Sequence, residues 1–210
     1  MGNTYYELYV KRCEELGELM HLYNGDVMNA KKLRGGVAAE LLKQLLNEYF
    51  SKNKKPYKAS NVNSYIAGSK FEYDLLIVKE SAEPFMGIVY RPEEVLAIIE
   101  CKAGGLIKVE NDTENIAKAV NRAIEINSDI RFGYITMSEN VPVNDYNRDG
   151  SATYRHWDKT KECLESKISG ETVIYAVTLH KGKREELYDK GSDEEFYDFI
   201  SYLIGENGVN

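Results

Sequence analysis

One apolar segment that ends in two opposite charges constrains this fold more than any other feature of the sequence. The run Val95–Ile99 contains only apolar residues, and Glu100, Cys101 and Lys102 follow it directly. An uninterrupted apolar run of this length predicts a buried strand. Side chains alternate faces along a strand, so Glu100 and Lys102 are expected on one face and Cys101 on the other. Buried opposite charges cost several kcal/mol per ion unless they are paired or bind a ligand.

A second carboxylate precedes a neighbouring apolar run. Asp74 stands directly before Leu75–Val78, which also predicts a strand. Two carboxylates and a lysine on neighbouring strands suit phosphodiester hydrolysis, because a divalent cation held by oxygen ligands stabilises phosphate charge and acidifies water. We expect Asp74 and Glu100 to bind the metal, with the Cys101 carbonyl as a third oxygen. Lys102 would orient or deprotonate the attacking water, or stabilise the transition state.

Helical and extended patterns alternate along the rest of the chain. We expect helices over residues 5–21, 35–50, 111–127, 159–167 and 193–204, and strands over residues 57–66, 72–78, 93–101, 132–137 and 172–179. Residues 79–92 are predicted to form a wide hairpin loop and residues 141–153 a polar loop. Strand–helix–strand units imply an α/β fold, with a central mixed β-sheet flanked by helices.

The length of 210 residues predicts a single domain. We expect residues 1–210 to fold together, with a core over about residues 30–180. The N-terminal helix 4–22 and the C-terminal helix 193–204 would pack on that core.

The order of the acidic residues resembles that of a known superfamily. Glu40 lies next to the apolar face of the helix expected over residues 35–50 and can point toward the interior. Glu40, Asp74 and the triplet Glu100–Lys102, in this order, resemble the PD-(D/E)xK nucleases, which share a restriction-endonuclease-like core. Tyr73 stands where the family name has proline. The resemblance spans roughly residues 35–137.

This resemblance implies roles for the matched residues. Asp74 and Glu100 would bind Mg²⁺, for which Mn²⁺ can substitute, Lys102 would be catalytic, and Glu40 would be an auxiliary ligand or water orienter. A further likeness is to an uncharacterised bacterial group within the superfamily that is found near restriction and defence genes. It is carried by residues 34–40, 71–78 and 95–102.

The function implied is a Mg²⁺-dependent endonuclease of restriction or defence type, with double-stranded DNA as the favoured partner. A nuclease of the same fold acting on RNA, or on branched or single-stranded DNA, is one alternative. Another is a non-catalytic nucleic-acid-binding or assembly module. Because a duplex cut needs two active sites, a homodimer is expected, or a place as one subunit of a defence complex.

Charge is unevenly distributed along the sequence. The net charge is −7, but residues 1–60 carry +3 and residues 61–150 carry −6. The acidic middle suits a divalent cation. The basic residues of the first third either meet phosphate or form a solvated face; they include Lys31, Lys32, Arg34, Lys52, Lys54, Lys55 and Lys58. The stretch 154–158 either contacts nucleic acid or packs a tryptophan under a helix start.

Cysteine spacing and hydropathy indicate the cellular compartment in which the chain is expected. Cys13, Cys101 and Cys163 are far apart and odd in number, which predicts no disulfide framework and a reducing cytoplasm. Cys101 is expected in the core rather than as a nucleophile. We expect no signal peptide and no membrane partner, because no stretch approaches the roughly 20 apolar residues of a spanning helix.

Overall fold

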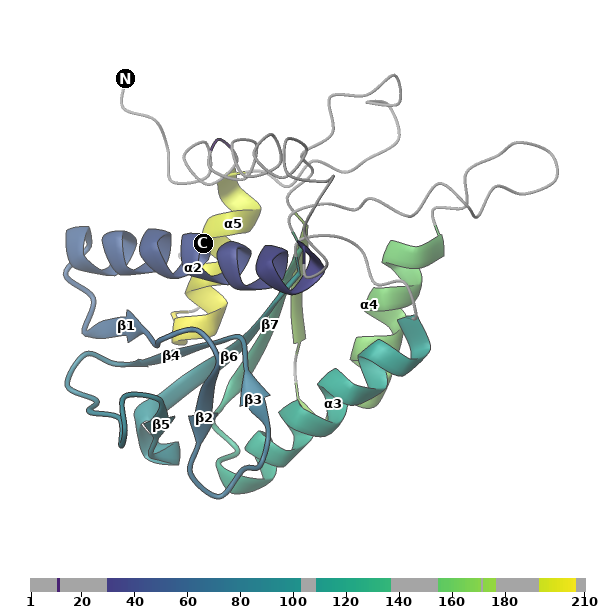
Figure 1. The fold of residues 1–210 in the computed structure, drawn as a ribbon. Helices are drawn as coiled ribbons and strands as arrows, with labels where there is room; N and C mark the ends of the chain where they lie inside the picture. Colours follow the sequence, from purple (N-terminus) through teal and green to yellow (C-terminus); the bar gives the residue numbers. More distant parts are fainter. Residues whose placement is uncertain are drawn as a thin grey trace, which may run out of the picture.

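Helices surround a central sheet in the computed structural model (Figure 1). The structure describes residues 11, 30–102, 109–136, 155–170, 172–176 and 193–206. Its helices are α2 (Ala30–Lys52), α3 (Val109–Ile126), α4 (Arg155–Lys167), α5 (Asp193–Ile204) and the 3₁₀ turn η1 (Pro92–Glu94). Its strands are β1 (Tyr57–Ala59), β2 (Ser64–Ile66), β3 (Glu72–Tyr73), β4 (Leu75–Lys79), β5 (Val89–Tyr90), β6 (Val95–Lys102), β7 (Arg131–Thr136) and β8 (Thr172–Ala176).

The main sheet is mixed, as the sequence predicts. Its strand order is β1-β4-β6-β7-β8. Strands β1, β4 and β6 pair antiparallel, whereas β6, β7 and β8 pair parallel through the crossover helices α3 and α4. A second small sheet has the order β3-β2-β5. The α/β expectation is therefore confirmed.

Helices cover both faces of the main sheet, and β6 lies at its centre. Alternate residues of β6 enter two separate hydrophobic clusters, because side chains alternate faces along a strand. The cluster under α2 and α5 includes Leu42, Leu46, Ile99, Cys101, Phe199 and Leu203. The cluster under α3 includes Ile98, Val120, Ala123, Tyr134 and Leu164. The expected core position of Cys101 is confirmed, since its side chain is 1% exposed.

Most predicted elements are confirmed, with two corrections in the strands. The strand predicted over residues 57–66 is two strands, β1 and β2, which belong to different sheets. The strand predicted over residues 72–78 is divided at Asp74 into β3 and β4. The loop predicted over residues 79–92 contains β5. The predicted helix 5–21 lies outside the described residues except for Lys11, and the predicted loop 141–153 lies outside them entirely.

Backbone hydrogen bonds explain the break at Asp74. Asn63 adopts a left-handed φ of 61°, which asparagine tolerates better than most residues. Its N–H donates to the Asp74 carbonyl at 3.1 Å. Ser60 bonds Leu76 twice, through its own N–H to the Leu76 carbonyl at 2.8 Å and through its hydroxyl, which accepts from the Leu76 N–H at 2.9 Å. The 60–63 turn thus holds the chain where it passes from one sheet to the other, and Asp74 lies at that junction.

None of the described helices is long and apolar enough to span a bilayer.

Candidate active site

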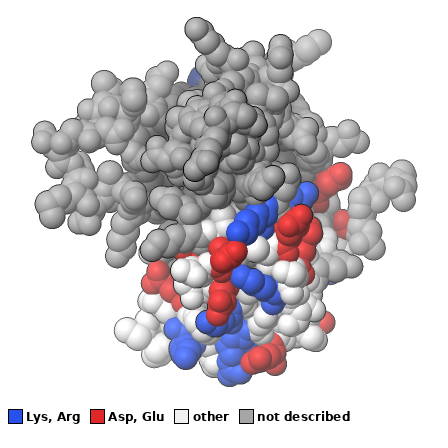
Figure 2. Space-filling model, turned by 90° about the vertical axis from the view of Figure 1, so that its right-hand side faces the viewer, with Lys and Arg blue, Asp and Glu red and all other residues white. Residues whose placement is uncertain are grey.

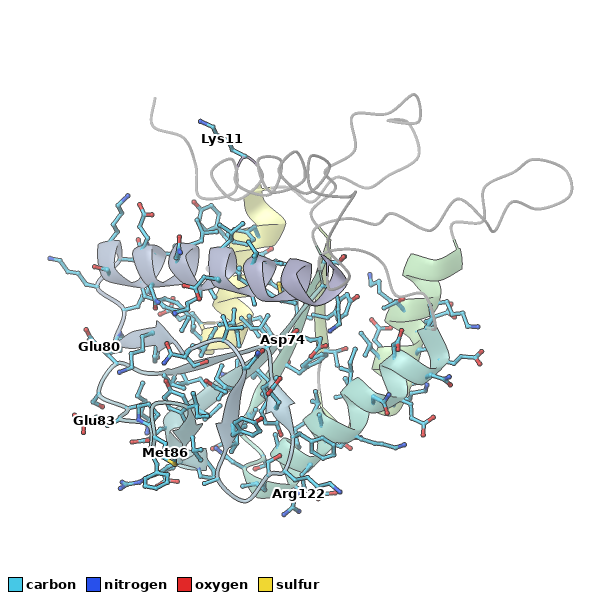
Figure 3. The ribbon with its side chains drawn as sticks, in the orientation of Figure 1. Lys11, Asp74, Glu80, Glu83, Met86 and Arg122 are labelled. Carbon is cyan, nitrogen blue, oxygen red and sulfur yellow. The ribbon has the colours of Figure 1, made fainter. Side chains whose placement is uncertain are left out.

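The antiparallel register of β4 and β6 brings Asp74 beside Glu100. Leu75 is paired with Ile99, so the next positions outward on the two strands are Asp74 and Glu100. Figure 3 labels Asp74 near the junction of the small sheet with the main one. Strand alternation places Glu100 and Lys102 on the same face, as predicted. Two acids that lie 26 positions apart in the sequence thereby become neighbours.

Lys102 joins the two carboxylates. Its Nζ forms an ion pair with Glu100 Oε1 and lies 3.6 Å from Asp74 Oδ2. Asp74 Oδ2 also accepts a hydrogen bond of 2.9 Å from the backbone N–H of Cys101. The Asp74 carboxylate is therefore held against β6 by one ion pair and one hydrogen bond. Side-chain exposures of 29% for Asp74, 18% for Glu100 and 32% for Lys102 leave the cluster within reach of solvent.

The electrostatics of this cluster leave the carboxylates in excess. Burial raises the pKa of Glu100, the neighbouring Asp74 raises it further, and the Lys102 ammonium only partly opposes this. For Lys102, burial alone would lower the pKa, but Glu100 and Asp74 outweigh it and raise the value. Lys102 is therefore protonated at neutral pH. Two carboxylates that share one ammonium make a site that attracts a further cation.

The donor set suits a hard divalent cation. The two carboxylates come from adjacent strands, and the Cys101 N–H points toward β4. In an antiparallel pair the N–H and C=O of one residue face the same neighbouring strand, so the Cys101 carbonyl is directed to the same side as Asp74. Oxygen ligands of this number and kind fit Mg²⁺ or Mn²⁺, which retain water and bind substrate phosphate.

Glu40 is not brought into this cluster. Its helix, α2, packs through its buried residues on the opposite face of the sheet from Glu100. The Glu40 side chain is 43% exposed and pairs at 3.3 Å with Lys43, which also donates to Asn61 at 3.3 Å. Among the described residues, no group of three or more His, Cys, Asp or Glu side chains could hold a metal ion. The auxiliary role of Glu40 stays a prediction.

Tyr134 is a site neighbour that the sequence reasoning missed. It lies opposite Glu100 in the β6–β7 register and is 1% exposed. Burial raises its pKa first, and the Glu100 carboxylate raises it further, so the phenol is neutral beside the acids. The only sequence signal was its place in the strand predicted over residues 132–137, which does not reveal the register with β6.

Several basic residues of the first third are engaged within the molecule. Lys52 pairs with Glu48 at 2.7 Å, Lys55 pairs with Glu206 at 2.6 Å, and Lys58 donates to the Ala82 carbonyl at 2.7 Å. The side chains of Lys31, Lys32 and Arg34, and those of residues 155–158 at the start of α4, lie outside the described residues. The predicted phosphate contacts of both stretches stay predictions.

Charges of both signs are mixed on the face that carries α3 and α4. Figure 2 shows acidic and basic side chains interspersed over the described part of this face. Three ion pairs account for much of the mixture: Lys118 with Glu114 and Lys159 with Glu110, both at 2.7 Å, and Arg122 with Glu125 at 3.0 Å. Exposed pairs of this kind contribute little to stability.

Comparison with known proteins gives the fold. No protein-family model and no curated protein matches the sequence. The cAAA-bound form of NucC from P. aeruginosa ATCC27853 aligns with 98% of this chain and 91% of its own, at 11% identity and a TM-score of 0.57. The cAAA-bound form of NucC from E. coli MS115-1 aligns with 98% and 90%, at 12% identity and 0.58, and its apo form with 91% and 90%, at 14% and 0.50. These likenesses show that the chain has the restriction-endonuclease-like fold implied by its resemblance to the PD-(D/E)xK nucleases.

Proposed function

We propose that this chain is a Mg²⁺-dependent endonuclease that hydrolyses DNA phosphodiester bonds. The observation that carries the proposal is the convergence of Asp74, Glu100 and Lys102 where β4 and β6 meet, with the lysine ion-paired to both acids. A buried ion pair that served packing alone would need only one carboxylate. The second acid leaves an excess of negative charge, which costs stability unless a cation offsets it.

Each residue has a distinct task in this proposal. Asp74, Glu100 and the Cys101 carbonyl would hold the metal, which supplies an activated water and charge stabilisation on the phosphate. The Cys101 N–H keeps the Asp74 carboxylate oriented. Lys102 is protonated, so it would donate a hydrogen bond to the water or to a phosphate oxygen rather than act as a general base.

The substrate and biological setting are inferred from fold likeness. The likeness to NucC covers nearly the whole chain, and the resemblance of Glu40, Asp74 and Glu100–Lys102 to the PD-(D/E)xK nucleases implies a nuclease. We infer a nuclease of defence type with double-stranded DNA as its substrate. Two of the similar structures hold cAAA, so this ligand belongs among the conditions of the assay.

Plasmid cleavage tests the proposal directly. Wild-type protein is incubated with supercoiled DNA in Mg²⁺, Mn²⁺ or EDTA, with and without cAAA. We expect nicking or linearisation with either metal and none in EDTA. Asp74→Ala and Lys102→Ala should each reduce the rate by at least about 100-fold, the loss typical of removing one transition-state interaction.

Matched variants identify what is specific to the site. Lys118→Ala removes an exposed lysine that is also paired with a glutamate, and it should leave cleavage unchanged. Glu40→Gln should reduce the rate by no more than about tenfold, because its carboxylate lies outside the cluster. Cleavage that survives both Asp74→Ala and Lys102→Ala would overturn the assignment of the site.

A substrate panel and a mass measurement address the alternatives. Preference for RNA, single strands or branched DNA, with the same dependence on Asp74, would change the substrate but not the site. Binding without turnover, unaffected by metal, would instead indicate a non-catalytic module. A monomeric mass at micromolar concentration, with and without DNA, would contradict the proposed homodimer.

A further inference from the structure

The Lys102 ammonium occupies the position between the two carboxylates that are proposed to bind metal. It pairs with Glu100 Oε1 and lies 3.6 Å from Asp74 Oδ2. Among the described residues, no other Lys, Arg or His side chain forms an ion pair with either acid. The only other donor recorded for these carboxylates in that part of the chain is the neutral Cys101 N–H.

We propose that Lys102 is the resident counter-ion of the metal-free site, and that a divalent cation must displace its ammonium from Glu100 and Asp74 in order to bind. This inference rests on the proposed function, since it concerns the same site. It assigns Lys102 a role before the reaction, in addition to the role that it would have during hydrolysis.

Charge and geometry both favour displacement over sharing. When both acids are ionised they carry two negative charges and the lysine carries one positive charge, so the cluster keeps one negative charge in excess. A divalent cation that bound the same oxygens with the ammonium still in place would be repelled by it at close range. A lysine side chain has a flexible four-carbon stem, and Lys102 is 32% exposed, so its ammonium can swing aside while its backbone stays in β6.

Displacement would also link metal binding to catalysis. While the ammonium is paired with Glu100, it is less available to a water molecule or a phosphate oxygen. With Asp74 and Glu100 engaged by the cation, the Lys102 ammonium would be free to donate a hydrogen bond to a water molecule or a phosphate oxygen. The opposite relation is that Lys102 holds the carboxylates apart in a binding-competent geometry, so that its loss weakens metal binding. Removal of the lysine charge should therefore tighten metal binding in the first case and weaken it in the second.

Direct metal titration without DNA tests the inference. Wild type, Lys102→Met and Lys43→Met are freed of metal and titrated with Mn²⁺, and bound metal is counted by electron paramagnetic resonance. Methionine retains much of the length of lysine and lacks its charge. We expect Lys102→Met to bind Mn²⁺ about 10- to 100-fold more tightly than wild type. Lys43 also bridges a carboxylate and a second oxygen, those of Glu40 and Asn61, so Lys43→Met should bind like wild type.

Thermal unfolding supplies a second readout. In EDTA, Lys102→Met should melt below wild type, because two neighbouring carboxylates have lost their shared partner. Saturating Mn²⁺ should then raise its melting temperature more than that of wild type, since tighter binding stabilises the folded state more. If Lys102→Met does not fold in EDTA, Lys102→Gln, which retains a hydrogen-bond donor, takes its place. Asp74→Asn added to either variant should remove the gain in affinity.

The outcomes separate this inference from the proposed function. If the neutral variant binds Mn²⁺ as weakly as wild type, or more weakly, the displacement inference is overturned while the metal site stands. If neither wild type nor the variant binds Mn²⁺ at millimolar concentration, both the inference and the metal-dependent function are overturned. If Lys43→Met binds Mn²⁺ as much more tightly as Lys102→Met does, the displacement inference is also overturned, because the gain in affinity would then come from net charge alone.

Discussion

At the scale of single residues, the chemistry of this chain depends on an imbalance among three side chains. Asp74 is fixed by the Cys101 N–H, Glu100 is more buried than Asp74, and Lys102 is charged between them. Either acid alone with Lys102 would make an ordinary ion pair. Burial is the largest cause that raises the pKa of Glu100, and the neighbouring Asp74 raises it further despite the adjacent Lys102 ammonium. The Lys102 ammonium alone therefore does not offset the cost of ionising the buried Glu100 carboxylate.

This imbalance predicts a pH dependence of stability in metal-free protein. The folded-state pKa of Glu100 lies above its ordinary value of 4.5, so the folded state holds this proton more tightly than the unfolded state. The resulting contribution to stability is fully present below pH 4.5 and is lost as the pH rises through the folded-state pKa. Glu100→Gln has no carboxyl group to titrate, so it does not lose stability in this way. The free energy of unfolding of wild type should therefore fall relative to that of Glu100→Gln over this range, as measured by urea unfolding in EDTA.

An exposed glutamate supplies the control for that experiment. Lys118 lowers the pKa of Glu114 through a hydrogen bond, so the contribution of Glu114 is present above pH 4.5 and is lost as the pH falls. Below pH 4.5, Glu114→Gln should therefore show a small difference from wild type in the opposite direction, and between pH 4.5 and pH 8 it should run parallel to wild type. Unfolding free energies of wild type and Glu100→Gln that run parallel between pH 4.5 and pH 8 would contradict the raised pKa.

At the scale of elements, the site depends on β6 being held in place from both faces. On one face α5 approaches the neighbouring strand β7 at Gly133, where there is no side chain to separate them. A Cβ at Gly133 would lie 2.9 Å from ring carbons of Phe199 and 3.0 Å from a methyl carbon of Leu203. Phe199 is 1% exposed and Leu203 is fully buried, so neither has free space to move into. Glycine at this position sets the distance between the sheet and α5.

Gly133→Ala should consequently destabilise the protein by about 1–3 kcal/mol, the range found for overpacked cores. The measurement is chemical unfolding followed by circular dichroism. Gly36→Ala is the matched control, because Gly36 lies in α2 and, among the described residues, no atom outside the nearby helix backbone comes within 4 Å of a Cβ placed there. Alanine in a helix interior favours folding, so Gly36→Ala should be neutral or stabilise by up to about 1 kcal/mol. Equal effects of the two substitutions would exclude close α5 packing as the cause.

At the scale of the whole molecule, local patterns in the sequence predict part of the site and miss the rest. The shared face of Glu100 and Lys102 follows from strand alternation, and the antiparallel register then supplies Asp74. Tyr134 was missed because register between strands is set by tertiary packing. Glu40 adjoins an apolar stripe, so the sequence allows it to point toward the interior, whereas its side chain is 43% exposed and pairs with Lys43. The strands β3 and β5 have two residues each, too few to show a period.

Whole-molecule charge leads to a final prediction about DNA binding. The chain carries a net charge of −7, and Lys52, Lys55 and Lys58 are bonded within the molecule. Affinity for DNA that comes from lysine and arginine contacts to phosphate falls steeply with salt, whereas a metal bridging the site to one phosphate adds few such contacts. We therefore expect a divalent cation to provide much of the attraction.

Binding of a labelled DNA duplex, followed by fluorescence anisotropy, tests this with Ca²⁺ in place of Mg²⁺. Ca²⁺ also takes carboxylate and carbonyl oxygens but accepts a looser geometry. Wild type should bind DNA at least about tenfold more tightly in Ca²⁺ than in EDTA, and this gain should depend only weakly on salt, because a metal bridge adds few contacts between basic side chains and phosphate. Asp74→Asn removes one ligand charge without adding bulk, so it should abolish the gain in Ca²⁺ and leave the affinity in EDTA nearly unchanged. Equal affinity in EDTA and Ca²⁺ would mean that DNA is held by basic residues instead, and the acidic cluster would then have no part in holding the substrate.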